Sequence, residues 1–297
     1  MANYHFRSLD PVIDPCWDPV FKSIFTKDTV PSEIARKKLL SAILEEPVEK
    51  LRITANEPPV SRLDQRQIRY DIHCLFNSGE RANIEMTLYP NAWEPLRLEY
   101  YLGRLFTSQK IRGDNASYGS LRRSYQISLL AKRKLFNDDR FNHHFMYYDP
   151  ESKLSLGGRT AIITLELEKL ESTAKKDVSA MSEKERWAVF FRYYNDTAKQ
   201  AIIDQIIHEE EGIAMAAEVI DGFTADEVAY FHEMSVEKYD LDMRAHRQEA
   251  WIEGEAKGIA EGRTKGRVEG EARVLELLKK SGYDTREIET ALKNSAK

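Results

Sequence analysis

Residues 70–88, YDIHCLFNSGERANIEMTL, decide the fold. Apolar and polar residues alternate in Ile68–Phe76 and again in Ala82–Leu88, and this period of two is typical of β-strands. The sequence Asn-Ser-Gly at 77–79 lies between the two runs and favours a tight turn. We therefore expect a hairpin of two antiparallel strands.

Two acidic residues lie on this hairpin, Asp71 on the first strand and Glu85 on the second. Side chains on facing strands can lie close together across the pair. Neighbouring carboxylates among apolar residues are costly unless they bind something. A hard divalent cation such as Mg²⁺ prefers carboxylate oxygens. The alternative is a pair of solvated acids at the edge of a sheet.

Further elements surround the hairpin. Pro19 is placed like the first residue of a helix, with Asp18 before it as the cap. The other expected elements are the helices Ser32–Leu44 and Leu96–Gln109 and the strands Tyr125–Leu130 and Thr160–Leu165. The order helix, strand, strand, helix, strand indicates an α/β fold, with a mixed sheet flanked by helices.

Strand patterns disappear after about residue 170, and an α-helical C-terminal region follows. The expected helices are Lys184–Tyr194, Asp196–Glu210 and Ala225–Tyr239. We therefore divide the chain into a core domain (1–170), a helical domain (171–240) and a tail (241–297).

The tail carries five glycines spaced by four, from Gly254 to Gly270, with charged residues between them. A glycine costs a helix roughly 1 kcal/mol relative to alanine, so five of them need a reason. In a helix this spacing traces a slowly winding stripe that lets a second helix approach closely. We expect oligomerisation or partner binding here, with a flexible linker as the alternative. Short helices are expected at Val274–Leu278 and Thr285–Leu292.

Composition and charge argue against a disordered chain and against a polyelectrolyte partner along the whole chain. The 297 residues are 42% hydrophobic and 31% charged, with a net charge of −5, which is typical of a globular chain. Residues 97–140 sum to +6 and residues 159–235 to −8. The basic segment can face phosphates, or it can form ordinary solvated helix faces.

The expected location is the cytoplasm. The apolar runs are far shorter than the roughly 20 residues of a membrane span, and the N-terminal sequence lacks the pattern of a signal peptide. The two cysteines, Cys16 and Cys74, favour free thiols over a disulfide framework.

Five short motifs occur in a telling order. They are Asp18–Phe25 (DPVFKSIF), Asn83–Met86 (NIEM), Arg97–Tyr101 (RLEYY), the pair Gly113 and Tyr118, and the glutamate- and glycine-rich tail. In this order they resemble the Rpn family of recombination-promoting nucleases, also described as putative transposases, in the PD-(D/E)XK nuclease superfamily. The resemblance extends over nearly the whole chain.

The resemblance implies a restriction-endonuclease-like core and a metal-dependent DNA endonuclease linked to recombination, mobile elements or phage defence. Asp71 and Glu85 would bind Mg²⁺ or Mn²⁺, with the backbone carbonyl of Met86 as a further ligand. Asp18 would be the helix-borne acid near the metal, or only the cap of its helix. A homodimer or higher oligomer is expected, because cutting both strands of DNA takes two sites.

One position departs from the family pattern. The residue two after Glu85 is lysine in the superfamily and usually glutamine in the family, but here it is Thr87. Lysine there can orient the attacking water and stabilise developing charge. Lys22 or Lys110 are candidates to replace it.

Candidates for contacts with DNA phosphates are Lys22, Arg97, Lys110 and Tyr101. Two other functions stay open. One is a DNA-binding or regulatory protein of the same fold that has lost catalysis, and the other is a protein–protein interaction module.

Overall fold

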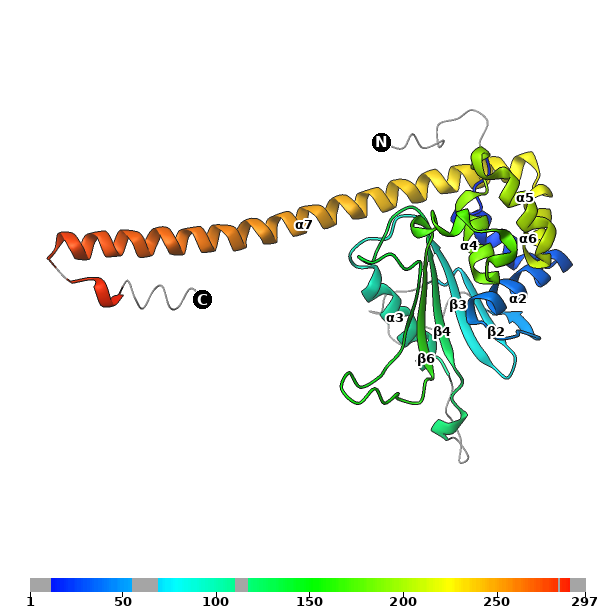
Figure 1. Cartoon of the computed structure of the whole chain (residues 1–297), viewed down its shortest axis with the longest axis horizontal. Coiled ribbons are helices and arrows are strands. Elements are labelled where there is room, and N and C mark those ends of the chain that lie inside the picture. The colour runs from blue at the N-terminus through cyan, green and yellow to red at the C-terminus, as the bar shows by residue number, and fades with distance from the viewer. Residues whose placement is uncertain (1–11, 55–68, 110–116, 283, 289–297) are drawn as a thin grey trace. The chain divides into compact units, whose positions relative to one another are not determined.

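A mixed sheet of six strands forms the centre of the chain in the computed structural model, which describes residues 12–54, 69–109, 117–282 and 284–288 (Figure 1). The strands, in the order β1-β2-β3-β4-β6-β5, are β1 (Leu51–Ile53), β2 (Ile72–Phe76), β3 (Glu80–Thr87), β4 (Ser124–Leu130), β6 (Thr160–Glu166) and β5 (Asn142–Phe145). The three strands β3, β4 and β6 run parallel, and the other pairs are antiparallel. The α/β class with a mixed sheet flanked by helices is confirmed.

Seven α-helices accompany the sheet in the described residues. They are α1 (Asp18–Thr26), α2 (Val30–Leu44), α3 (Glu94–Thr107), α4 (Glu183–Tyr193), α5 (Gln200–Glu209), α6 (Glu211–Asp221) and α7 (Ala225–Lys280). Short 3₁₀ turns occur at Tyr118–Ser120, Leu167–Lys169, Thr173–Lys175, Val178–Ala180 and Thr197–Lys199.

The hairpin forms as the sequence predicts, because its turn residues tolerate positive φ. Asn77 has φ of 42° and Gly79 has φ of 102°, in the region that Asn and Gly adopt most easily. The Asn77 side chain also accepts a hydrogen bond from the backbone of Glu49 and donates one to the carbonyl of Pro47. The turn is thereby tied to the segment that leads into β1.

The two faces of the sheet differ in chemistry. On one face, residues such as Ile72, Cys74 and Ile84 join the main hydrophobic core with side chains of α1, α2, α4, α5 and α6. Figure 1 shows α2, α4, α5 and α6 gathered on one side of the strands and α3 on the other. The face toward α3 is polar, although its side chains are buried: Asn83, Glu85, Thr87, Gln126, Ser128 and Thr164. A buried polar face of this kind is a candidate for function.

Local signals in the sequence fix the helix starts. The Thr29 side chain accepts from the backbone N–H of Ser32 at the start of α2. Ser182 and Glu185 form a reciprocal capping box at the start of α4. At Gly212 an added Cβ would lie 2.3 Å from the Cβ of Lys38, so glycine allows α6 to approach α2 closely.

The chain divides into two compact units, Met1–Asp242 and Met243–Lys297. The division predicted at residue 170 does not separate compact units, because α2 packs against both α4 and α6 and draws the helical region into the first unit. β1, β5 and the separate helix α6 escape the sequence analysis. The region predicted as one helix, Asp196–Glu210, begins as a 3₁₀ turn before α5.

In the tail, α7 is one uninterrupted helix of 56 residues that contains all five spaced glycines, in agreement with the helical alternative, and the short helix expected at Val274–Leu278 is part of it. Pairs of opposite charge four residues apart support it in the second unit, such as Lys257 with Glu261 and Lys280 with Glu276. Among the described residues nothing lies within 4 Å of a Cβ added at any of the five spaced glycines. The second half of the expected helix Thr285–Leu292, residues 289–292, lies outside the described residues.

A search of the described helices for a membrane-crossing segment finds none of sufficient length and apolar character.

Candidate functional site

The strand register brings the two hairpin carboxylates to one place. Ile72, the first residue of β2, is paired with Ile84, so Asp71 just before Ile72 and Glu85 just after Ile84 are neighbours across the hairpin. The charge of Asp71 contributes to raising the pKa of Glu85, as expected for two carboxylates close together.

Asp71 is held by its neighbours in three dimensions. Its Oδ2 accepts a hydrogen bond of 3.3 Å from the backbone N–H of Met86, and its Oδ1 lies 3.0 Å from Nζ of Lys22. Lys22 comes from α1 and also pairs with Oδ2 of Asp18 at 2.9 Å. The other oxygen of Asp18 pairs with Nζ of Lys238, from the first turns of α7, at 2.9 Å.

Asp18 does not cap its helix. It is the first residue of α1, the N-cap is Trp17, and among the described residues no side-chain capping hydrogen bond is formed at this helix start. Two ammonium groups attract the Asp18 carboxylate instead. The capping alternative from the sequence is therefore wrong, and Asp18 lies beside Asp71 through the shared Lys22.

Glu85 is fully buried, with 0% of its surface exposed. Its Oε2 lies 2.7 Å from Nη2 of Arg97, and its Oε1 accepts a hydrogen bond of 2.9 Å from the Asn83 side chain. Arg97 also pairs with Glu94 at 3.2 Å. Glu94 accepts a hydrogen bond of 3.3 Å from the hydroxyl of Thr87, the residue that departs from the family pattern. Thr87 is thereby bound to an acid of α3.

The site concentrates charge in a buried setting. Burial raises the pKa of Glu85 to about 8, against the opposing effect of Arg97, and the Asp71 charge adds to the rise. Burial and then the Asp18 charge raise the pKa of Asp71. Burial opposes ionisation of Asp18 too, but Lys238 and Lys22 outweigh it and lower its pKa. Ionised Glu85 thus needs more positive charge than Arg97 supplies.

The donor set fits a hard divalent cation. Asp71 and Glu85 offer carboxylate oxygens, the ligands that such an ion prefers, and burial raises the pKa of both groups. The backbone of Met86 also points to this place. The backbone N–H of Arg81 donates to the carbonyl of Arg123, and the carbonyl of Thr87 accepts from the N–H of Ala131, so the backbone groups of odd-numbered β3 residues point toward β4. The N–H and C=O of Met86 therefore point the opposite way, toward Asp71.

The other candidates divide into three groups. Lys22 lies in the site, paired with both aspartates. Arg97 is turned toward Glu85 and Glu94, and Tyr101 lies under it, with the guanidinium 5.1 Å from the ring centroid. Lys110 lies outside the described residues.

The sequence analysis missed Glu94 and Lys238. Glu94 carries a weak signal, since it lies three residues before Arg97 on one helix and such residues meet on one face. Lys238 carries none, because it reaches Asp18 across 220 positions in the chain.

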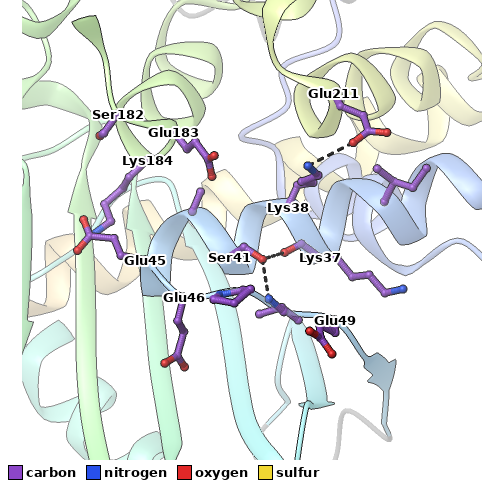
Figure 2. Close-up of a pocket in the computed structure, with 14 residues that line it drawn as sticks. Lys37, Lys38, Ser41, Glu45, Glu46, Glu49, Ser182, Glu183, Lys184 and Glu211 are labelled. Carbon is purple, nitrogen blue, oxygen red and sulfur yellow. Dashed lines mark hydrogen bonds and ion pairs between the residues drawn. The ribbon is translucent and has the colours of Figure 1, made fainter.

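A separate pocket of about 670 Å³ lies between α2 and the starts of α4 and α6 (Figure 2). Its lysines are already paired with acids: Lys37 with Glu33, Lys38 with Glu211 and Lys184 with Glu45. None of the candidate residues lines this pocket.

Comparison with protein families gives one match. The model described as PD-(D/E)XK nuclease family transposase matches residues 15–250, a range that includes Asp18, Lys22, Asp71, Glu85 and Lys238. Comparison with curated proteins and with solved structures returned no match.

Proposed function

The chain belongs to the PD-(D/E)XK nuclease family transposases, and on this premise we propose that it is a metal-dependent endonuclease that hydrolyses phosphodiester bonds in DNA. One observation carries the proposal: Asp71 and Glu85 are neighbours across the hairpin, and burial raises the pKa of both carboxyl groups despite their ion pairs with Lys22 and Arg97. We propose that both carboxylates and the carbonyl of Met86 hold Mg²⁺ or Mn²⁺.

The contacts of each residue suggest its role in the proposed site. A divalent ion supplies Lewis-acid stabilisation to a phosphoryl group undergoing displacement. Arg97 positions Glu85 through its 2.7 Å ion pair and favours the ionised carboxylate that a metal requires. Asn83 fixes the other oxygen of Glu85. Glu85 therefore presents a defined orientation rather than a range of rotamers.

In the superfamily pattern, a lysine lies two positions after the acid that corresponds to Glu85. We propose that Lys22 takes the role of this lysine here. Thr87 cannot supply a charge, and its hydroxyl already donates to Glu94. The ammonium of Lys22 lies 3.0 Å from Asp71, at the same group of carboxylates, and reaches it from α1. From there Lys22 can donate a hydrogen bond to the attacking water or to a phosphate oxygen.

The same contacts favour a second candidate, a protein that binds DNA without cutting it. Asp18, Asp71 and Glu85 each already have a basic partner, and these pairs can take the place of a metal. In this case binding to DNA weakens with salt but metal adds nothing.

The wider setting is also part of the proposal. We infer a role in DNA recombination, mobile elements or phage defence, a cytoplasmic location, and a dimer that brings two sites to the two DNA strands. Light scattering coupled to gel filtration measures the assembly directly, and a monomer at micromolar concentration would contradict the dimer.

Plasmid cleavage tests the function. Supercoiled DNA is incubated with the wild type and Asp71→Asn in Mg²⁺, in Mn²⁺ and in chelator. Nicked and linear products are expected from the wild type with metal, and none from Asp71→Asn or in chelator. Salt-sensitive DNA binding with no cleavage in any metal would favour the second candidate. Equal cleavage by the wild type and Asp71→Asn would rule out the proposed site.

A further inference from the structure

A second group of metal-ligating side chains lies at the end of β6. Asp138, His143 and Glu166 each place one potential ligand atom within 4.8 Å of the others. Glu166 is paired with Leu130, which is paired with Thr87, so this group lies two strands away from the hairpin site. Two strand spacings amount to about 10 Å, which is too far for one ion to serve both sites.

His143 shows that the group is incompletely satisfied. It is 6% exposed, and its Nε2 lies 2.8 Å from Oδ2 of Asp138. Its Nδ1 has no hydrogen-bond partner among the described residues and faces Oε2 of Glu166 at 3.8 Å. A neutral imidazole has one donor and one acceptor nitrogen, so it cannot donate to both carboxylates.

A lysine now supplies positive charge to the group. The ammonium of Lys169 pairs with Glu166 and lies 3.0 Å from Oδ1 of Asp138, and its side chain is 1% exposed. Two carboxylates therefore face this one ammonium, and the exposed Arg140 lies 3.3 Å from Asp138 at the outside of the group. The two carboxylates thus converge on a cation, with an imidazole beside them.

We propose that Asp138, His143 and Glu166 bind a transition-metal ion of the Zn²⁺ or Co²⁺ class, which displaces the ammonium of Lys169. An imidazole with two carboxylates suits these ions, whereas Mg²⁺ favours oxygen ligands alone. The Asp138 side chain is 38% exposed, which gives the ion a path from solvent and leaves room for water as a further ligand.

The bound ion would stabilise the contact between the segment 135–138 and β6. Glu166 accepts hydrogen bonds from the backbone N–H groups of Leu135 and Phe136 at 2.5 and 3.1 Å. A metal on Glu166 and Asp138 therefore clamps the segment 135–138 between β4 and β5 against β6. The inference does not depend on nuclease activity.

Two substitutions should act in opposite directions. Loss of an imidazole ligand in His143→Ala should weaken binding at least about tenfold, since even outer partners of a metal ligand are worth that much. Lys169→Met removes the competing ammonium and should tighten binding several-fold. His144→Ala is the matched control, because His144 is the next residue of β5, exposed, and points to the other face.

The test is a Co²⁺ titration of the full chain, followed by visible absorption, in an Asp71→Asn background that disables the hairpin site. Saturable binding that falls in His143→Ala, rises in Lys169→Met and is unchanged in His144→Ala is the expected result. Circular dichroism checks folding, and if Lys169→Met does not fold, the two histidine variants decide the outcome. No saturable binding by the background chain, or equal binding by His143→Ala, would overturn the proposal.

Discussion

Glu85→Gln should change how the stability of the protein depends on pH. The unfolded chain has the ordinary glutamate pKa of 4.5, and burial raises the pKa of Glu85 in the folded protein to about 8. Between these values the native state binds more protons than the unfolded state. The free energy of unfolding therefore falls as pH rises from about 4.5 to about 8, and the contribution of protonated Glu85 is fully present only below the lower value.

The size of the effect follows from the width of this interval. A shift of this size, at about 1.4 kcal/mol for each pKa unit, sets a ceiling of about 5 kcal/mol on the loss. Relaxation around the ionised carboxylate reduces the measured value below that ceiling. Glutamine does not titrate and keeps an oxygen for Arg97, so Glu85→Gln should lack this part of the pH dependence.

Urea unfolding in chelator, followed by tryptophan fluorescence between pH 5 and pH 8.5, measures the difference. The wild type should lose stability relative to Glu85→Gln as pH rises, by several kcal/mol over the range. Added Mg²⁺ at pH 8 should restore part of the loss in the wild type only, because it binds the ionised carboxylate. Parallel pH profiles of stability for the two proteins would refute the raised pKa of the buried Glu85.

Three further substitutions test other parts of the account. Lys22→Met should lower the rate of plasmid cleavage on the order of 10²- to 10³-fold while Mg²⁺ binding persists, and an unchanged rate would show that Lys22 has no catalytic role. Lys238→Ala should tighten Mg²⁺ binding several-fold in calorimetry, because it removes a positive charge that acts on Asp71 and pairs with the neighbouring Asp18; weaker binding would contradict this. Gly212→Ala should destabilise the chain by about 1–3 kcal/mol in urea unfolding, because the new Cβ meets Lys38 on α2, and equal stability would show that the helices separate freely.

The sequence predicts the hairpin and the position of its acids because both depend on local pattern. Alternation sets the strands, Asn77 and Gly79 set the turn, and turn and pattern together set the register that brings Asp71 close to Glu85. The edge strands escape because β1 has three residues and β5 four, too few for a period to show.

The partners of the acids could not be predicted, because they depend on tertiary packing. Lys238 reaches Asp18 from α7, and its position in the chain gives no hint of this pair. The same holds for the group around His143, whose ligands come from the β4–β5 segment, β5 and β6. The sequence leaves both a helix and a flexible linker open for the tail because glycine propensity argues against a helix, whereas ion pairs four residues apart support the unbroken α7.

The central claim is that Asp71 and Glu85 share one divalent ion. Anomalous diffraction from a crystal grown with Mn²⁺ tests it most directly, because it locates the ion independently of activity. The account predicts a peak about 2 Å from an oxygen of each carboxylate and beside the carbonyl of Met86. An ordered hairpin with Lys22 and Arg97 still on the two acids and no peak between them, in the presence of saturating Mn²⁺, would contradict it.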